Sequence, residues 1–307
     1  MYKIVDATPD RHSESPYNID LTEIEFSEVE RLKSETYKYY KLEQDYDLAK
    51  QSVIDFKSAM YRACHEISQH NFDDDIYRYE IISKLSLKLF GSLNLLKKYH
   101  ENIIQYGRNE EIKCDLISDI TNRKNTYSDN ISIIRKKTAI EIGEAIRNYC
   151  QHAAIPTENC TLGGGKDEIT NQFFIKFSLW LPAGKILKAK IQSRNRSIIE
   201  SDGKAIYDLH HVVDCYFDAI TEIHIQSRKI LLPYIIQNIN KISDLIEIYT
   251  NEFKEKNHLK PTLQITKNNN DLFFITLGSL PALIKYLSEK NDTLPCYSSR
   301  VERRTYY

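Results

Sequence analysis

The chain has 307 residues, a formal net charge of −1 at pH 7, and 41% hydrophobic and 28% charged residues. This composition is typical of a globular protein and excludes one that coats nucleic acid through bulk positive charge, so any nucleic-acid site must be a local basic patch. Only 9 Gly and 8 Pro are present, which argues against a turn-rich all-β architecture. We expect a mainly α-helical protein with small β-hairpin insertions.

The first part of the chain predicts two long helices. Residues 1–20 are polar and contain two prolines, which predicts a loose leader. Apolar residues then recur at alternating steps of three and four, as in a helix packed along a partner helix: Tyr39, Leu42, Tyr46, Ala49, Val53, Phe56, Met60, Ala63 and Ile67. A second series consists of Ile82, Leu85, Leu89, Leu93, Leu96 and Ile103. We therefore expect a long antiparallel helical hairpin over residues 21–106, with Asp20 or Thr22 as its N-cap.

Residues 107–257 are expected to form a helical core. A short helix is predicted within residues 110–126, followed by a long helix from about Ser128 to Ala154. Apolar residues at three- and four-residue steps indicate the long helix: Ile131, Ile134, Ala139, Ile142, Ala145, Ile146 and Tyr149. Pro156 disfavours helical geometry at the residue before it, which ends this helix near Ala154.

The next segment predicts a β insertion within this core. The glycines of residues 163–165 indicate a flexible connection. Two β-like runs, Phe173–Leu181 and Ile186–Ile191, predict a β-hairpin at about residues 171–192. Helical spacing resumes from about residue 202 to residue 256, with Pro233 as a break or kink.

The C-terminal part predicts a second, smaller set of elements. Residues 258–290 should contain another β-hairpin, with strands at 262–266 and 271–277, and a short helix that starts at Ser279. The two hairpins are candidates for one small sheet. Residues 291–307 form a basic and aromatic tail.

The sequence Arg147-Asn148-Tyr149-Cys150-Gln151-His152 lies at the end of the helix predicted over residues 128–154. An Arg, a directly following Asn, and a His five positions after the Arg resemble the signature of the HEPN superfamily of all-helical ribonucleases. The resemblance implies a HEPN-like helical bundle and an endoribonuclease that needs no metal or other cofactor. It further implies products with 2′,3′-cyclic phosphate and 5′-hydroxyl ends.

The resemblance also implies roles for four residues. An imidazole exchanges protons near neutral pH, which suits His152 to proton transfer. Arg147 stays charged and can bind two phosphate oxygens at once. Asn148 would hold the phosphate or orient the histidine, and Glu144 would position the surroundings of Arg147 or pair with Arg147 of another subunit. A basic cluster on the same helix would contact RNA: Arg135, Lys136 and Lys137.

Five residues turn an ideal helix by roughly 140°, so Arg147 and His152 do not share a face. Either the end of the helix is distorted so that His152 turns toward Arg147, or a homodimer that pairs two such helices brings them together. By resemblance, the protein would be a toxin or an antiviral-defence effector with an antitoxin or defence-system partner protein. A signal pattern and an apolar run of membrane-spanning length are absent, and no two of the six cysteines form a Cys-x-x-Cys pair. We therefore expect a cytoplasmic protein without a membrane partner.

Two other classes of function remain open. The first is a non-catalytic helical scaffold or interaction protein, in which the motif is coincidental or decayed. The second is a metal-dependent hydrolase that uses His211 and Cys215, which lie four residues apart on one predicted helix face. Cys150 is either a nucleophile paired with His152 or a buried structural thiol.

Overall fold

The computed structural model describes residues 2–6, 18–69, 75–103, 105–106, 112–113, 115–121, 138–152, 160–166, 168–169, 171, 173–189, 191, 193–252, 263–267, 280–292 and 305–306. The described chain is mainly helical with small antiparallel sheets, which confirms the expected fold class at this level. It divides into two compact units. Unit 1 comprises residues 1–44, 115–124 and 227–292, and unit 2 comprises residues 45–114, 125–226 and 293–307.

Unit 1 combines a three-stranded sheet with helical segments. The sheet has the order β2-β1-β8 and is antiparallel throughout. The elements of unit 1 are β1 (Tyr2–Asp6), β2 (Asn18–Leu21), the start of α1 (Glu23–Gln69), α3 (Asp115–Thr121), the end of α8 (Leu209–Glu252), β8 (Leu263–Lys267) and α9 (Leu280–Lys290).

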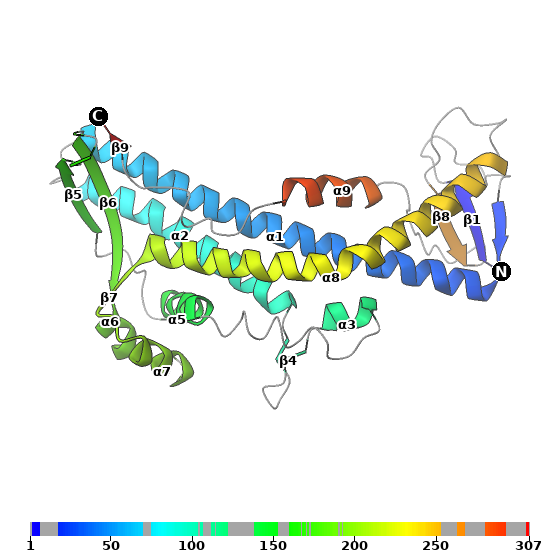
Figure 1. Ribbon diagram of the computed structural model, residues 1–307, viewed down its shortest axis with the longest axis horizontal. Helices are drawn as coiled ribbons and strands as arrows, with labels where there is room; N and C mark the ends of the chain where they lie inside the picture. Colours follow the sequence, from blue (N-terminus) through cyan, green and yellow to red (C-terminus); the bar gives the residue numbers. More distant parts are fainter. Residues whose placement is uncertain are drawn as a thin grey trace. The chain divides into compact units, whose positions relative to one another are not determined.

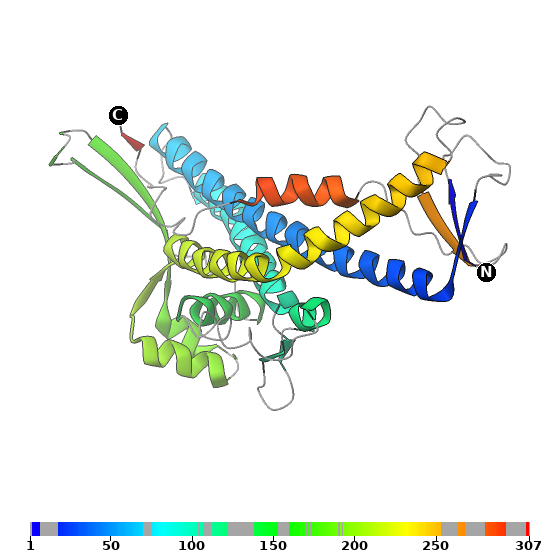
Figure 2. The same cartoon turned by 45° about the vertical axis from the view of Figure 1, so that its right-hand side comes forward.

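Unit 2 contains the remaining parts of α1 and α8 and all the other elements, whose course Figures 1 and 2 show from two directions. They are α2 (Asp75–Ile103), β3 (Gln105–Tyr106), β4 (Ile112–Lys113), α5 (Thr138–His152), β5 (Cys160–Lys166), β6 (Phe173–Pro182), α6 (Ala183–Lys188), α7 (Ser193–Asp202), β7 (Ile206–Asp208) and β9 (Thr305–Tyr306). Strand β6 is the centre of a sheet in which it pairs antiparallel with β5, β7 and β9.

Helix α1 begins where the sequence predicts a cap. The Thr22 hydroxyl accepts a hydrogen bond from the Glu25 backbone N–H at 3.2 Å, and the Glu25 carboxylate accepts one from the Thr22 N–H at 2.8 Å. This reciprocal pair is a capping box, which satisfies two backbone donors that a helix start leaves open. All nine apolar residues predicted along α1, from Tyr39 to Ile67, are buried.

The predicted antiparallel hairpin is present in unit 2. In three contacts between α1 and α2, the residue numbers rise along α1 while they fall along α2, so the two helices are antiparallel. Asp45 pairs with Lys98 at 3.0 Å, the Ser52 carbonyl accepts from the Ser92 hydroxyl at 2.8 Å, and Asp55 pairs with Lys88 at 3.3 Å. The predicted face of α2 is buried except at its first position, where Ile81 is buried in place of Ile82.

A buried carboxylate organises unit 1. Glu43 of α1 accepts hydrogen bonds from the Tyr39 hydroxyl at 2.9 Å and from the Asn291 amide at 3.0 Å. Arg228 of α8 lies 3.1 Å from the same carboxylate. Because a charge is buried at low cost only when it is paired and hydrogen-bonded, this network makes the burial of Glu43 compatible with a stable core.

The loose leader and the single sheet made from the two hairpins were predicted wrongly, whereas the strand predicted at 262–266 is present as β8. Residues 2–6 and 18–21 are not a loose leader but form β1 and β2, and β1 also pairs with β8. The sheet of unit 1 shares no strand with that of β6, so the two predicted hairpins do not form one sheet. The predicted second strand at 271–277 lies outside the described residues. Strand pairing depends on distant partners, which local composition does not reveal.

The insertion at residues 171–192 also differs from the prediction. Its first strand is present as β6, but the partner of β6 is β5, which contains the three glycines predicted to be a flexible connection. The predicted second strand is instead helix α6. Ala183 and Ile186 are both buried, and their three-residue spacing places them on one helix face. Alternation over a few residues fits a short helix as well as a strand, which explains the error.

Helix α8 begins at Leu209 rather than near residue 202, because residue 202 ends α7 and β7 occupies residues 206–208. It continues through Pro233, which therefore does not end the helix. Proline removes one backbone hydrogen bond, but Leu231 and Ile235 on either side are fully buried. The short helix predicted within residues 110–126 is confirmed as α3, and the one predicted from Ser279 is confirmed as α9, with Ser279 itself outside the described residues.

Candidate functional site

Helix α5 carries the Arg–His motif and belongs to unit 2. Its apolar stripe is buried and includes Ile140, Ala145, Ile146 and Tyr149. Gly143 lies so close to Tyr216 of α8 that an added Cβ atom would overlap the tyrosine ring. The described helix runs from Thr138 to His152, close to the predicted end. The packed stripe fixes the rotation of the helix, and it thereby sets the direction in which each motif side chain points.

Arg147 is half-buried and is held by three neutral amide oxygens. Its Nε atom donates to Asn94 Oδ1 of α2 at 2.9 Å, and its Nη1 atom donates to Asn148 Oδ1 at 3.1 Å and to Gln151 Oε1. Among the described residues no carboxylate pairs with Arg147, and its Nη2 atom has no hydrogen-bond partner. The guanidinium is therefore oriented without being neutralised, which leaves its charge available to an anion.

Asn148 joins Arg147 to a second cation. The side chain of Asn148 is buried, and its Oδ1 atom also accepts from Lys97 Nζ of α2 at 3.5 Å. Lys97 lies 3.5 Å from Glu101 as well. Arg147 and Lys97 thus both donate to one neutral oxygen, which brings the two cations close together at this point of α5.

Glu144 makes a contact that the sequence did not suggest. Its Oε1 atom lies 2.8 Å from Nδ1 of His100, and the His100 side chain is almost fully buried. Within one chain, Glu144 is therefore engaged with a histidine of α2. Its predicted pairing with Arg147 of another subunit remains a prediction.

His152 is the last residue of α5 and is exposed. It makes no hydrogen bond or ion pair with any residue in the described part of the chain. The structure thus brings Arg147 and Asn148 into direct contact and leaves His152 open to solvent five positions later. The basic cluster Arg135, Lys136 and Lys137 lies outside the described residues.

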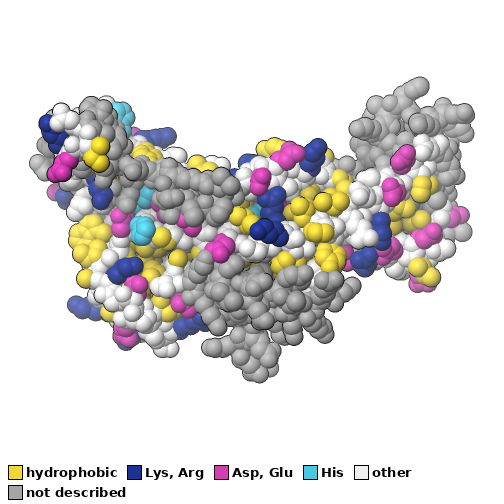
Figure 3. Space-filling model, viewed as in Figure 1, with side chains coloured by type: hydrophobic (Ala, Val, Ile, Leu, Met, Phe, Trp, Pro, Cys, Tyr) yellow, Lys and Arg dark blue, Asp and Glu magenta, His cyan; other side chains and the backbone are white. Residues whose placement is uncertain are grey.

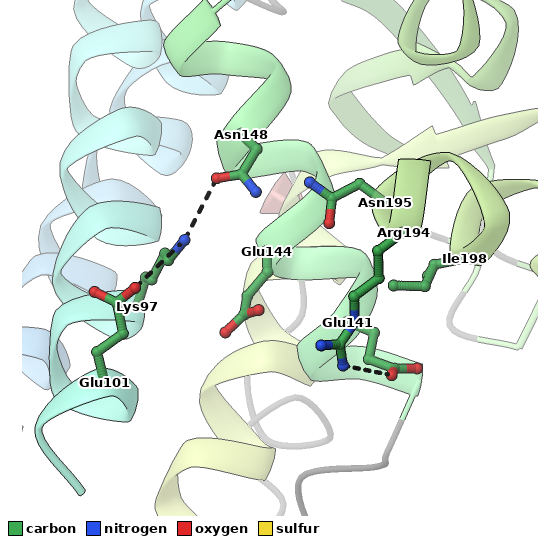
Figure 4. Close-up of a pocket in the computed structure, with 8 residues that line it drawn as sticks. All are labelled: Lys97, Glu101, Glu141, Glu144, Asn148, Arg194, Asn195 and Ile198. Carbon is green, nitrogen blue, oxygen red and sulfur yellow. Dashed lines mark hydrogen bonds and ion pairs between the residues drawn. The ribbon is translucent and has the colours of Figure 1, made fainter. Parts of the chain in front are cut away.

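A polar pocket of about 210 Å³ adjoins this cluster (Figure 4). Helices α2, α5 and α7 line it with Lys97, Glu101, Glu141, Glu144, Asn148, Arg194, Asn195 and Ile198. It contains two of the predicted catalytic residues, Glu144 and Asn148, but neither Arg147 nor His152. Arg194 lies 3.7 Å from Glu141 across the pocket wall.

Three residues of this region were missed by sequence reasoning: Lys97, His100 and Asn195. Lys97 and His100 belong to a helix whose apolar spacing is the only strong signal in that stretch. Their relation to α5 depends on tertiary packing. Arg194, by contrast, belongs to a cluster of basic residues, 185–196, which the sequence offers as a candidate nucleic-acid patch.

The other nucleophile and metal candidates are poorly placed for chemistry. Burial raises the pKa of the Cys150 thiol to about 12, which keeps it protonated and unreactive near neutral pH. His211 and Cys215 do lie together, with 3.4 Å between Nε2 and Sγ. Within the part of the chain that the structure describes, no group of three His, Cys, Asp or Glu side chains is arranged to hold a metal ion.

Unit 1 contains a larger groove of different character. It has a volume of about 580 Å³ and lies between α8 and α9, where Leu232, Ile236, Ile239, Pro281, Ala282 and Ile284 contribute apolar surface. Figure 3 shows hydrophobic side chains gathered over this region of the visible face. Such a lining suits an apolar contact rather than acid–base or phosphate chemistry, so the chemical candidates are those of unit 2.

Comparison of the chain with protein-family models, with curated proteins and with solved structures returns no match. The function is therefore inferred from the residues of α5 and their surroundings. Of the helices in the described residues, none has the length and apolar character needed to cross a membrane.

Proposed function

We propose that this chain is a metal-independent endoribonuclease of the HEPN type. One observation carries the proposal: Arg147 is oriented by amide oxygens, faces no carboxylate among the described residues, and precedes an exposed histidine at the end of the same helix. A structural arginine of this degree of burial is commonly paired with a carboxylate. An arginine that must bind a phosphate needs its charge uncompensated.

In the proposed reaction, RNA supplies its own nucleophile. A base removes the proton of the 2′-hydroxyl, the 2′ oxygen forms a bond to phosphorus, and the bond from phosphorus to the 5′ oxygen breaks. The leaving oxygen takes up a proton. His152 performs proton transfer at one or both of these steps, and Arg147 binds the non-bridging phosphate oxygens as negative charge develops on them. Asn148 fixes the orientation of Arg147, to which it is hydrogen-bonded. The products carry 2′,3′-cyclic phosphate and 5′-hydroxyl ends.

The biological role that we propose for the nuclease rests on the resemblance alone. A nuclease of this type acts as a toxin or an antiviral-defence effector, and an antitoxin or defence-system protein restrains or triggers it. The competing function is a non-catalytic interaction protein. The hydrogen bond from Arg147 to Asn94 favours this alternative, because it connects α5 to α2 and so gives Arg147 a structural role. Cleavage of RNA by the purified protein separates the two.

The first prediction concerns metal ions. Cleavage of total RNA by the purified protein should proceed at an unchanged rate in excess EDTA, because none of the proposed steps uses a metal. The rate is measured by gel electrophoresis, and treatment with a cyclic phosphodiesterase and a phosphatase identifies the product ends. Loss of cleavage on chelation, with recovery on addition of zinc or magnesium, would contradict the mechanism and favour the metal-dependent alternative.

The second prediction concerns assembly. Since Arg147 and His152 are five residues apart on α5, we propose that a homodimer completes the site by pairing two α5 helices. If one cleft needs both histidines, mixing wild type with a threefold excess of His152→Ala subunits should reduce the activity per wild-type subunit to about one quarter after subunit exchange. Activity that stays proportional to the wild-type subunits, or a monomer by light scattering, would contradict a shared site.

A further inference from the structure

Arg147 uses three of its five N–H groups in hydrogen bonds within the chain. Nε donates to Asn94, and Nη1 donates to Asn148 and to Gln151. The two N–H groups that are left both belong to Nη2, because a guanidinium carries one on Nε and two on each Nη. Arg147 therefore approaches a phosphate through a single nitrogen atom, which leaves room for a second cation at the same phosphate.

Lys97 of α2 is such a cation. Its Nζ atom lies 3.5 Å from Asn148 Oδ1, the same oxygen that accepts from Arg147 Nη1 at 3.1 Å. Figure 4 shows the Lys97 side chain reaching from α2 toward Asn148 at the wall of the polar pocket. Charge-assisted hydrogen bonds are about 2.7–2.9 Å long, so two nitrogens that share one neutral oxygen are close enough to bind a single phosphate group.

The packing of α2 places Lys97 at this point. The neighbouring Leu96 is fully buried, which fixes the rotation of the helix. Asn94 and Lys97 are three residues apart and therefore project from one face. On that face, Asn94 accepts from Arg147 and Lys97 donates to Asn148. One face of α2 thus supplies both a group that orients Arg147 and a second positive charge.

The charge of Lys97 is only weakly compensated. Its one carboxylate partner among the described residues is Glu101, at 3.5 Å, and the Glu101 side chain is 55% exposed. An ion pair with so exposed a carboxylate contributes little, because water screens the attraction. Folding nevertheless brings Lys97 close to the charge of Arg147, and two like charges that share one neutral oxygen repel each other. An anion bound between the two cations removes that repulsion.

We infer that Lys97 is a second phosphate-binding residue of the site and that it binds the scissile phosphate of RNA together with Arg147. The assignment rests on the proposed ribonuclease function. A phosphodiester carries one negative charge, which rises toward two as the 2′ oxygen adds to phosphorus. Arg147 balances the first charge, and Lys97 stabilises the charge that develops in the transition state. The loss of Lys97 should therefore affect kcat more than KM.

Substitutions at Lys97 and Glu101 separate this role from a structural one. If Lys97 serves only as the partner of Glu101, Lys97→Met and Glu101→Gln break the same ion pair and should have similar effects. If Lys97 binds phosphate, Lys97→Met should lower kcat about tenfold or more with a smaller change in KM. Lys97→Arg should keep most of the activity, because the positive charge is kept. Glu101→Gln removes a competing carboxylate and should leave kcat unchanged or raise it.

Binding without cleavage provides a second readout. An oligonucleotide with 2′-deoxy sugars keeps every phosphate but lacks the nucleophile, and fluorescence anisotropy measures its binding to the full-length protein at several salt concentrations. Each phosphate contact contributes about 0.7 to the slope of log K against log salt for a single strand, so Lys97→Met should reduce the slope by about 0.7. Lys97→Arg should keep the wild-type slope.

Two further variants serve as controls. Lys98→Met removes an exposed lysine of α2 that pairs with Asp45 of α1, and it should keep the wild-type kcat and salt slope. Lys97→Gln keeps a hydrogen-bond donor toward Asn148 without the charge, so it should behave as Lys97→Met does, and it replaces that variant if Lys97→Met does not fold. Circular dichroism and thermal unfolding show which variants are folded.

The outcomes distinguish this inference from the ribonuclease proposal. Cleavage at the wild-type kcat by the uncharged Lys97 variants, or equal losses in Lys97→Met and Glu101→Gln, would overturn the role of Lys97 and keep the nuclease. A wild type that does not cleave RNA, together with the reduced salt slope in Lys97→Met, would keep the phosphate site and overturn the nuclease. An unchanged slope in a protein that does not cleave RNA would overturn both.

Discussion

Replacing His152 by alanine should reduce the rate of RNA cleavage by about 10²–10⁴-fold, the usual contribution of a general acid or base. The loss should appear in kcat rather than in RNA affinity, because the imidazole transfers protons and supplies little binding. Stability should be unchanged, since His152 is exposed at the end of α5 and bonds to no described residue. Single-turnover cleavage of a labelled RNA measures the rate, and thermal unfolding measures the stability.

Arg147 variants complete this experiment. Arg147→Ala should abolish cleavage, and Arg147→Lys should remain severely impaired, because an ammonium group lacks the planar fork that binds two phosphate oxygens. Matched controls come from the same unit: His211→Ala removes an exposed histidine of α8, and Arg196→Ala removes an exposed arginine of α7. Near wild-type rates in both His152→Ala and Arg147→Ala would remove the basis of the nuclease proposal and favour a scaffold.

The sequence predicted the long-range helical organisation well, because apolar periodicity is recorded in every turn of a long helix. The seam from Tyr39 to Ile67 is buried at every predicted position, and so are Ile142, Ala145, Ile146 and Tyr149 of the stripe predicted along α5. The cap at Thr22 was also visible, since it needs only residues three apart. These features depend on local patterns that a single sequence contains.

The strands and the pocket could not be predicted in the same way. β1 pairs with β8 and β6 pairs with β9, so these strands are stabilised in part by residues far away in the chain. The glycines of β5 indicate a loop by composition, and only pairing with β6 makes them a strand. Likewise, His100 reaches Glu144 through the packing of α2 on α5. No spacing in the sequence encodes that contact.

A further prediction with a large expected change concerns the free energy of unfolding. Lys57 of α1 and Asp214 of α8 form an ion pair at 2.7 Å within unit 2, with side chains that are only 4% and 5% exposed. Nδ1 of His210 lies 3.2 Å from the other carboxylate oxygen of Asp214. Removing one partner of a buried pair leaves an uncompensated charge in the core. Lys57→Met, which keeps the volume, should therefore lower the free energy of unfolding by about 3–5 kcal/mol.

A double variant tests whether the unpaired charge causes this loss. In Lys57→Met/Asp214→Asn, residue 214 is neutral but still offers an oxygen to His210, so the double variant should be more stable than Lys57→Met alone. The exposed pair Lys88–Asp55, at 3.3 Å, provides the control, and Lys88→Met should cost less than about 1 kcal/mol. Urea unfolding followed by circular dichroism measures all four proteins. If the double variant is no more stable than Lys57→Met, lost packing rather than a buried charge explains the effect, and the pair is not what stabilises this part of the core.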